Sequence, residues 1–396
     1  MLRRSLRLDS RHADKGATTT ALCAAILAAV TPMVLPIPAK AQSSVTLYGI
    51  ISTGISYVSN QGGKSGVQMV SGPLQNNRWG LRVSEDLGDG TSAMATLENG
   101  FNSSTGALGQ GGRMFGRQAW VGLSDKKYGT LTAGRQYDMM WDYLDYLEPQ
   151  GMGPGFGVSV GSNDNIEGNF RYSNSLKYRS PDFGGFTFEG LYAFSNKAGA
   201  FTQNRAYSFG AGYVTPSYRI VAAYLDIDRP GLANSMGAVS DDYQGAGFAL
   251  FHTSPLDSKV GVEHQRVAAV GGMYSVGKFV LSGIVSDVRY EYLDHTGLHL
   301  DNFDLIGRYR FTPALSLSLA YLYTTGRYSG LNVNPHWNQG QISLDYSLSK
   351  RTDIAIWANS IRSSGPLTYA PAVLFLATPS NSHSQFAALA GIRHLF

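Results

Sequence analysis

Most of the chain alternates between apolar and polar side chains with a period of two residues. From Leu315 to Tyr323 the odd positions carry leucine or tyrosine, whereas Ser316, Ser318 and Ala320 lie between them. Such alternation indicates a β-strand, because successive side chains of a strand point to opposite faces. The pattern therefore predicts an all-β protein. Runs of this kind begin near residues 45, 76, 91, 114, 129, 171, 185, 205, 217, 266, 278, 302, 315, 338, 351 and 385, which predicts 16 strands.

The connections between these runs alternate in length, which decides between a barrel and a sandwich. A soluble sandwich has no reason to place all its short turns at one end, whereas an outer-membrane barrel has short periplasmic turns and long external loops. We therefore expect a 16-stranded antiparallel transmembrane β-barrel; a soluble exported β-helix or sandwich is disfavoured, since hexapeptide-like repeats are absent. The short connections are 86–90, 124–129, 180–185, 275–278, 311–314 and 347–350; the long ones are 59–74, 104–113, 138–170, 227–265, 328–337 and 363–384.

The first 41 residues have the features of an export signal. A basic start precedes the apolar run Ala17–Val30, and a stretch broken by proline leads to Ala39-Lys40-Ala41. This small-x-small pattern predicts cleavage before Gln42 and leaves residues 42–396 as a single barrel domain. A retained helical anchor is the disfavoured alternative, because the apolar core is short. Beyond this segment no apolar run is long enough for a spanning helix.

Removing the leader changes the charge of the protein. The leader carries six of the 32 Lys and Arg residues and two of the 28 Asp and Glu residues, which leaves 26 of each and no net charge. No basic footprint for nucleic acid remains. Cys23, the only cysteine, is lost with the leader, so the mature chain forms no disulfide. Stability must then come from backbone pairing and packing.

Several motifs resemble those of the Gram-negative general porins, in particular the trimeric β-proteobacterial type. The resemblance implies a homotrimer of 16-stranded barrels in the bacterial outer membrane, surrounded by lipid and lipopolysaccharide, with the third long loop (about 138–170) folded into the lumen. The terminal Phe396 is similar to the signal read by the barrel insertion machinery, and it also suits an interfacial aromatic girdle. The motifs are SSVTLYG (43–49), NRWGLRVSEDLGDG (77–90), LENGFN (97–102), GRMFGRQAWVGL (112–123), GTLTAGRQY (129–137), NSLKYRSPDFGGF (174–186) and GIRHLF (391–396).

Arginines are the candidates for a positively charged side of the pore. Alternation places Trp79, Leu81 and Val83 outside, which directs Arg78 and Arg82 into the lumen. Arginine is costly on the lipid face, by about 2–4 kcal/mol at the midplane, so a lumen position is favoured. The resemblance adds three further candidates for the basic wall of the constriction: Arg117, Arg171 and, more weakly, Arg135.

Arg117 departs from simple alternation. It shares parity with Val121 and Leu123, which are expected outside. The resemblance implies instead that Arg117 points inward and that Gln118 and Trp120 lie outside, which requires this wall to face a neighbouring subunit. Parity alone leaves both arrangements open.

Acidic candidates lie opposite the arginines. Glu98 belongs to the third predicted strand, and Asp138, Asp142, Asp145 and Glu148 lie in the third long loop among Met, Trp, Tyr and Leu. That mixture predicts a short helical turn packed inside the wall, with its carboxylates in the lumen. The neighbouring aromatics either pin this loop to the wall, which we favour, or form a slide that guides sugars; they are Tyr137, Trp141, Tyr143 and Tyr146.

The predicted function is passive diffusion of ions and small hydrophilic solutes through a charged constriction. Guanidiniums facing carboxylates across a narrow slot create a transverse field that polar solutes tolerate and apolar solutes do not. A substrate-selective channel, for sugars for example, and an adhesive or structural barrel are the alternatives. An enzyme is not expected: His295 and His299 lie on a loop, Ser382-His383-Ser384 is adjacency rather than a triad, and the sequence has no phosphate-binding, dinucleotide or zinc motif. We therefore expect no cofactor and no metal.

Overall fold

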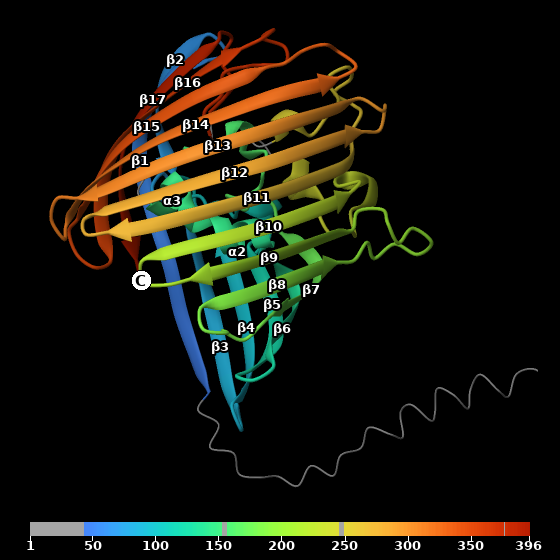
Figure 1. The fold of residues 1–396 in the computed structure, drawn as a ribbon, viewed down its shortest axis with the longest axis vertical. Coiled ribbons are helices and arrows are strands. Elements are labelled where there is room, and N and C mark those ends of the chain that lie inside the picture. Colours follow the sequence, from blue (N-terminus) through green and yellow to red (C-terminus); the bar gives the residue numbers. More distant parts are fainter. Residues whose placement is uncertain (1–42, 153–156, 245–248, 376) are drawn as a thin grey trace, which may run out of the picture. The chain divides into compact units, whose positions relative to one another are not determined.

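The computed structural model describes residues 43–152, 157–244, 249–375 and 377–396. The predicted leader lies outside these residues and stays a prediction. Within the described part, 17 strands form one antiparallel sheet (Figure 1). They are β1 (Ser44–Gln61), β2 (Lys64–Ser71), β3 (Arg78–Gly88), β4 (Thr91–Gly100), β5 (Gln118–Asp125), β6 (Gly129–Gln136), β7 (Tyr172–Arg179), β8 (Phe186–Ala193), β9 (Ala206–Val214), β10 (Tyr218–Asp228), β11 (Val262–Val276), β12 (Phe279–Tyr292), β13 (Gly297–Arg310), β14 (Leu315–Ser329), β15 (His336–Ser347), β16 (Thr352–Ser364) and β17 (Ser384–Leu395).

The sheet closes on itself. From β3 onward each strand pairs with the next, and β17 returns to pair with β1, from Ile50 opposite Leu395 to Val58 opposite Ala387. The ring of Phe396 then lies over Gly49, where an added Cβ would come within 2.2 Å of the ring. Closure leaves no open edge along this seam, which is what a sheet in lipid requires.

The barrel has 16 strand positions because two of the 17 strands share one. The first part of β1 pairs with β3, and its last part, from Thr53 to Gln61, pairs with β2. Strands β2 and β3 are therefore two pieces of one barrel position, interrupted at residues 72–77. The predicted count of 16 is confirmed. The prediction that residues 59–74 form a loop is wrong, because β2 lies within them.

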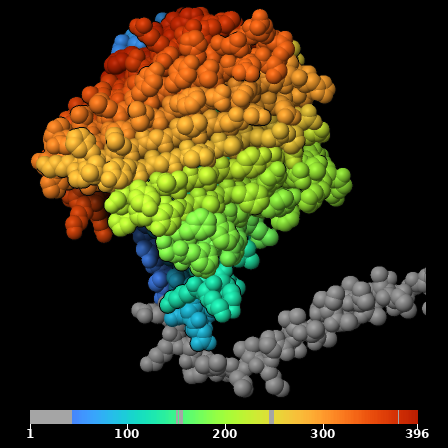
Figure 2. Space-filling model, viewed as in Figure 1, coloured from blue at the N-terminus to red at the C-terminus, as the bar shows by residue number. Residues whose placement is uncertain are grey.

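Exposure alternates along the strands as the sequence predicts. On β12, Phe279, Leu281 and Val285 are exposed, whereas Ser282 and Ser286, which have the opposite parity, are buried. The exposed side chains at alternate positions form a continuous apolar surface of the kind that faces lipid. In Figure 2 the strands from β8 to β14, coloured green to orange, form an unbroken wall of side chains. Among the described residues, no helix is both long and apolar enough to cross a bilayer.

The helices lie in the long connections. The connection between β6 and β7 contains α2 (Met139–Leu144) and α3 (Pro149–Met152), joined by the 3₁₀ turn Asp145–Leu147. The connection between β10 and β11 contains 3₁₀ turns, including Asp241–Gln244. The connection between β4 and β5 contains another, Gln110–Gly112.

The described residues of segment 138–170 pack against the buried side chains of strands β9 to β13. The Tyr143 ring lies on Gly210, where an added Cβ would be 2.6 Å from the ring, and Leu147 lies on Gly271 in the same way. Glycine is required at these positions because only a residue without Cβ lets the helix approach so closely. Ser282 on β12 also donates a hydrogen bond to the Leu147 carbonyl, at 2.8 Å. The segment is thus held by glycine contacts and by polar contacts to the inner side chains.

Candidate functional site

Three arginines gather on the wall formed by β3 to β7, and we call Arg78, Arg117 and Arg171 the arginine group. Arg117 Nε donates to Glu98 Oε1 at 2.8 Å, and the Tyr48 hydroxyl donates to the other oxygen of Glu98, also at 2.8 Å. The Arg117 and Glu98 side chains are only 2% and 5% exposed. Glu98 therefore neutralises one of the three guanidiniums in a well-buried pair.

Tyr137 joins two members of the arginine group. Arg171 Nη2 donates to the Tyr137 hydroxyl at 2.7 Å. The guanidinium carbons of Arg171 and Arg117 lie 4.7 Å and 5.7 Å from the Tyr137 ring centroid. The ring stacks in turn on Trp141, with centroids 4.6 Å apart. An aromatic face lets two planar guanidiniums approach each other at reduced cost.

Arg117 lies inward because it precedes its strand. Strand β5 begins at Gln118, which lies opposite Glu98 in the β4–β5 register and hence on the same face. Val121 and Leu123 are exposed on the other face, as alternation predicts. The expectation that Gln118 and Trp120 lie outside is corrected: both share the inner face, and Trp120 Nε1 donates to Gln118 Oε1 at 2.9 Å. No departure from strand alternation is needed to bring Arg117 to Glu98.

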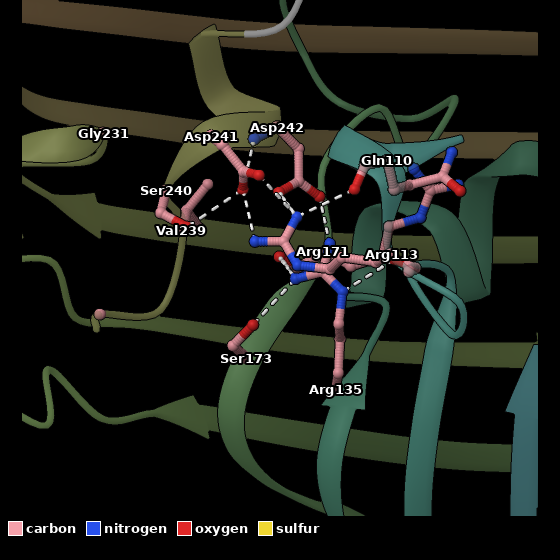
Figure 3. A network of polar contacts seen from close by, with 12 residues as sticks. Gln110, Arg113, Arg135, Arg171, Ser173, Gly231, Val239, Ser240, Asp241 and Asp242 are labelled. Atoms are coloured by element: carbon pink, nitrogen blue, oxygen red, sulfur yellow. Dashed lines mark hydrogen bonds and ion pairs between the residues drawn. The ribbon is translucent and has the colours of Figure 1, made fainter. Parts of the chain in front are cut away.

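Arg82 and Arg135 stand apart from the arginine group. Arg82 shares the face of Arg78 but is exposed and lies over the Tyr48 ring, 4.1 Å from its centroid. Arg135 is almost fully buried and uses all three of its nitrogens. They donate to the Gly116 carbonyl at 2.8 Å, to the Ser173 hydroxyl at 2.9 Å and to the carboxylate of Asp242 (Figure 3). Arg135 therefore clamps the ends of β5 to β7 rather than presenting a free charge.

The loop acids do not form one row opposite the arginines. Asp138 is the N-cap of α2: it accepts the Trp141 N–H at 3.1 Å and the Tyr172 hydroxyl at 2.9 Å, and it is fully buried. Asp142 pairs with Lys177 on β7. Neither carboxylate projects toward the arginine group, contrary to expectation, because each is used to hold the segment in place.

The other two loop acids have different surroundings. Asp145 interacts electrostatically with Arg78 and Arg117 and is therefore the loop acid that partly offsets the charge of the arginine group. Glu148 is fully buried beside other carboxyls, and burial together with the neighbouring Glu167 raises its pKa well above the usual range. Glu148 is thus an interior acid and not a charge facing the arginines.

Sequence reasoning missed three charged residues that the structure brings to this region. Asp241 and Asp242 lie in the loop between β10 and β11, and Arg113 lies in the loop between β4 and β5. Partial burial alone would raise the pKa of Asp241, but the Arg113 guanidinium outweighs it and lowers that pKa to about 2. The sequence shows only an Asp-Asp pair in a loop, and no pattern in it indicates that the loop folds back.

A polar cavity of about 230 Å³ lies beside the arginine group. Arg117, Arg171 and Glu167 line it together with Asn77 and Gln110. The Nη2 of Arg117 and the Nε of Arg171 are buried without a hydrogen-bond partner among the described residues. Such donors can hold water or the oxygen atoms of a small polar solute.

Two groups of histidine and aspartate have the spacing of a cation site, and both lie at the ends of strands β10 to β13. One consists of Asp226, Asp228 and His264; the other of Asp287, His299 and Asp301. Three of their four carboxylates already pair with arginines, and the fourth, Asp301, contacts His299. The three pairs are Arg205 with Asp228, Arg266 with Asp226, and Arg289 with Asp287. These groups are therefore accounted for as ion pairs.

Replacing Glu98 by Gln should destabilise the barrel. The change leaves the Arg117 guanidinium buried without its carboxylate, and breaking a buried pair in this way costs on the order of 3–5 kcal/mol. Thermal unfolding in detergent measures the effect. The control is Glu85→Gln, which makes the same change at an exposed position of β3. Equal unfolding temperatures for the two variants would contradict the assigned pair.

The loop between β10 and β11 should lose stability in acid because of His252. Its ring stacks on Tyr243, with centroids 3.8 Å apart, and burial lowers the pKa of His252 to about 4. A lowered pKa in the folded state means that the unfolded state binds the proton more readily than the folded state does. The contribution of His252 to the free energy of unfolding is therefore fully present above about pH 6.5 and is lost as the pH drops toward 4. We expect a loss of about 2 kcal/mol at pH 5 that His252→Phe removes and His383→Phe, at an exposed position, does not. Unfolding temperatures at two pH values test this.

The comparisons with known proteins point in one direction. A family model described as Gram-negative porin matches residues 19–366. An outer membrane porin of Bordetella pertussis is 36% identical over 231 residues, covering 52% of this chain and 58% of that one. Outer membrane porin protein 32 of Delftia acidovorans is 29% identical over 262 residues, covering 64% and 66%. The matched region thus spans less than two thirds of either relative.

Solved structures share the fold. An anion-selective porin from Comamonas acidovorans superposes with a TM-score of 0.71 at 21% identity, covering 90% of this chain and 100% of that one. OmpT of Vibrio cholerae, solved in a trimer form, gives a TM-score of 0.62 at 13% identity and covers 89% of this chain and 99% of that one. At these identities the likeness is one of fold.

Proposed function

Because the chain belongs to the Gram-negative porin family, we propose that it forms a water-filled diffusion channel across the outer membrane. The channel passes ions and small hydrophilic solutes and prefers anions. It has no catalytic activity and needs no cofactor. The observation that carries this proposal is the arginine group on one wall beside a polar cavity, in which only Arg117 is paired directly with a carboxylate, that of Glu98.

Segment 138–170 narrows this channel. It contacts the buried side chains of β9 to β13, whereas the side chains that alternate with them form the exposed apolar face. These contacts support a position of the segment inside the wall. The arginine group then faces a lumen reduced to the space between the segment and strands β3 to β7. Asp145 supplies an opposing negative charge. Charges of opposite sign across a narrow slot orient water and polar solutes and slow apolar ones.

The preference for anions follows from the charges that remain uncompensated. Among the described residues, Arg78 and Arg171 form no direct ion pair; Glu98 and Asp145 act on Arg78 only at longer range, and Asp242 acts on Arg171 in the same way. Arginine keeps its charge at any working pH, so this excess is permanent. The Comamonas acidovorans porin of similar fold is described as anion-selective, which agrees with the proposal.

A homotrimer is the proposed assembly. Within the described part of the chain, β2 pairs with β1 alone, so its second edge is open, and its Val67 and Met69 side chains are among the most exposed apolar ones. A neighbouring copy that covers this edge would remove the liability of an unpaired strand. Outer-membrane lipid and lipopolysaccharide surround the remaining surface, and Phe396 serves the insertion machinery.

A substrate-selective channel is less well supported. The aromatics that could guide a sugar are used in packing: Tyr137 is 3% exposed and Tyr143 is 6% exposed. Tyr146 is partly buried, with Arg219 lying 4.6 Å from its ring centroid. They pin segment 138–170 to the wall, which is the interpretation that the sequence favoured.

Conductance of the purified protein in planar bilayers tests the proposal. We expect discrete steps in groups of three that rise linearly with salt and do not change when sugars are added. Liposomes containing the protein should swell in solutions of small sugars. If one particular solute blocked the conductance steps, the protein would be a substrate-selective channel and not a general pore. Absence of steps from a demonstrably folded barrel would overturn the channel altogether.

A further inference from the structure

The loop of residues 229–261, between β10 and β11, is described except for residues 245–248, and it brings two aspartates to Arg113 in the β4–β5 loop and to Arg135 on β6. Asp241 forms a bidentate contact with Arg113, at 2.8 Å and 2.6 Å. Asp242 pairs with Arg135 and also lies 3.6 Å from Arg113. The four charges alternate in sign, from Asp241 through Arg113 and Asp242 to Arg135 (Figure 3). They join three separate parts of the barrel.

Other contacts hold the loop in this place. The Ala238 carbonyl accepts the Ser173 N–H at 2.9 Å, and the Met236 carbonyl accepts the Asn174 side chain at 2.7 Å. The loop therefore passes β8 and β9 to reach the start of β7. On its other side the Tyr243 hydroxyl donates to Gln265 on β11 at 2.8 Å. The two aspartates are thus held in a defined place, with Asp242 close to Arg171 of the arginine group.

Burial makes the Arg135–Asp242 ion pair stronger than the Arg113–Asp241 ion pair. The Arg135 and Asp242 side chains are 10% and 5% exposed, whereas Arg113 and Asp241 are each more than a third exposed. Salt screens the exposed pair and has little effect on the buried one. Asp242 also acts electrostatically on Arg171, a member of the arginine group. Without the aspartates, Arg113 and Arg135 would add two positive charges next to that group.

We propose that Asp241 and Asp242 determine ion selectivity: by neutralising Arg113 and Arg135 they reduce the anion preference that the arginine group would otherwise impose. The proposal rests on the channel function proposed above. It gives the 229–261 loop a specific task beside the arginine group, and that task depends on the charge of the two carboxylates rather than on the loop's presence alone. The larger share belongs to Asp242, because it is buried between two guanidiniums.

The test compares reversal potentials of matched variants across a potassium chloride gradient. Asp242→Asn should raise the ratio of chloride to potassium permeability by roughly twofold or more, since a unit charge about 8 Å from a permeating ion attracts potassium and repels chloride even in water. Asp241→Asn should raise it less, and the double variant more than either. Asp257→Asn removes the same charge from an exposed position of the same loop and should leave the ratio unchanged.

Two further measurements separate charge from loop displacement. Asp242→Glu keeps the charge and should keep the wild-type ratio. If Asp242→Asn acts by charge, its effect should shrink as salt is raised, whereas a displaced loop would change the conductance at every salt concentration. The inference would be overturned, and the channel function left intact, if wild type, Asp242→Asn and Asp241→Asn all conducted normally and had the same ratio of chloride to potassium permeability. Absence of conductance in every protein would overturn the channel function itself.

Discussion

Replacing Arg78 and Arg171 together by serine should turn an anion-preferring channel into one that prefers cations. These two guanidiniums form no direct ion pair within the described part of the chain, so their removal takes two positive charges from the pore wall and leaves the carboxylates that act on them from a distance. What remains of the arginine group is Arg117 with its partner Glu98, together with Asp145 nearby. The sign of the remaining charge is therefore negative.

The expected size of this effect follows from Coulomb's law. Two unit charges at roughly 8 Å contribute about 1 kcal/mol for each permeating ion in water, with opposite signs for chloride and potassium. The permeability ratio should change on the order of tenfold, and more at low salt, where screening is weaker. Reversal potentials at two salt concentrations measure it. Arg351→Ser, in the exposed turn between β15 and β16, is the matched control. If the double variant still preferred anions, the arginine group would not be the cause of the anion preference.

Replacing Gly210 by valine should narrow the channel. An added Cβ would lie 2.6 Å from the Tyr143 ring and 2.9 Å from the Met139 Cβ, so α2 must move away from β9. With α2 inside the wall, as proposed above, that movement is toward the lumen. Overpacking of this kind costs about 1–3 kcal/mol, which leaves the closed barrel folded.

The measurement is the single-channel conductance, which we expect to fall by roughly half, because the current through a narrow pore follows its smallest cross-section. The control is Gly340→Val on the exposed face of β15, where an added Cβ meets nothing within 4 Å. Equal conductance of Gly210→Val and wild type, in barrels of equal unfolding temperature, would show that α2 does not border the conducting path.

The strands could be predicted from the sequence because the two faces of a barrel wall differ so strongly. Runs expected near 129 and 315 begin at Gly129 and Leu315, and all 16 barrel positions were found. Strand β2 was missed because it is short and lies in a polar stretch, with only Val67 and Met69 to mark its apolar face. Arg117 was ambiguous because its strand begins one residue later, and alternation applies only within a strand.

The candidate site was predicted in part. Arg78, Glu98, Arg117 and Arg171 come together as motifs on separate strands suggested. Asp138 could not be assigned, because a helix-capping carboxylate and a pore-lining one look alike in sequence until the helix and its partners are in place.

The pairing of the 229–261 loop with the wall depends on the path of a long connection. Asp241 and Asp242 meet Arg113 and Arg135 across more than 100 positions of sequence, and nothing periodic marks such a contact. Loop paths are decided by scattered contacts such as the stack of Tyr243 on His252, which only the folded chain displays.

The reversal potential of the wild-type protein across a potassium chloride gradient tests the central claim most directly. A water-filled pore lined by the arginine group should conduct in discrete steps and show a potential with the sign of chloride permeation, and that potential should decrease as salt screens the guanidiniums. A folded barrel that does not conduct, or one that conducts with the sign of cation permeation at low salt, would contradict it.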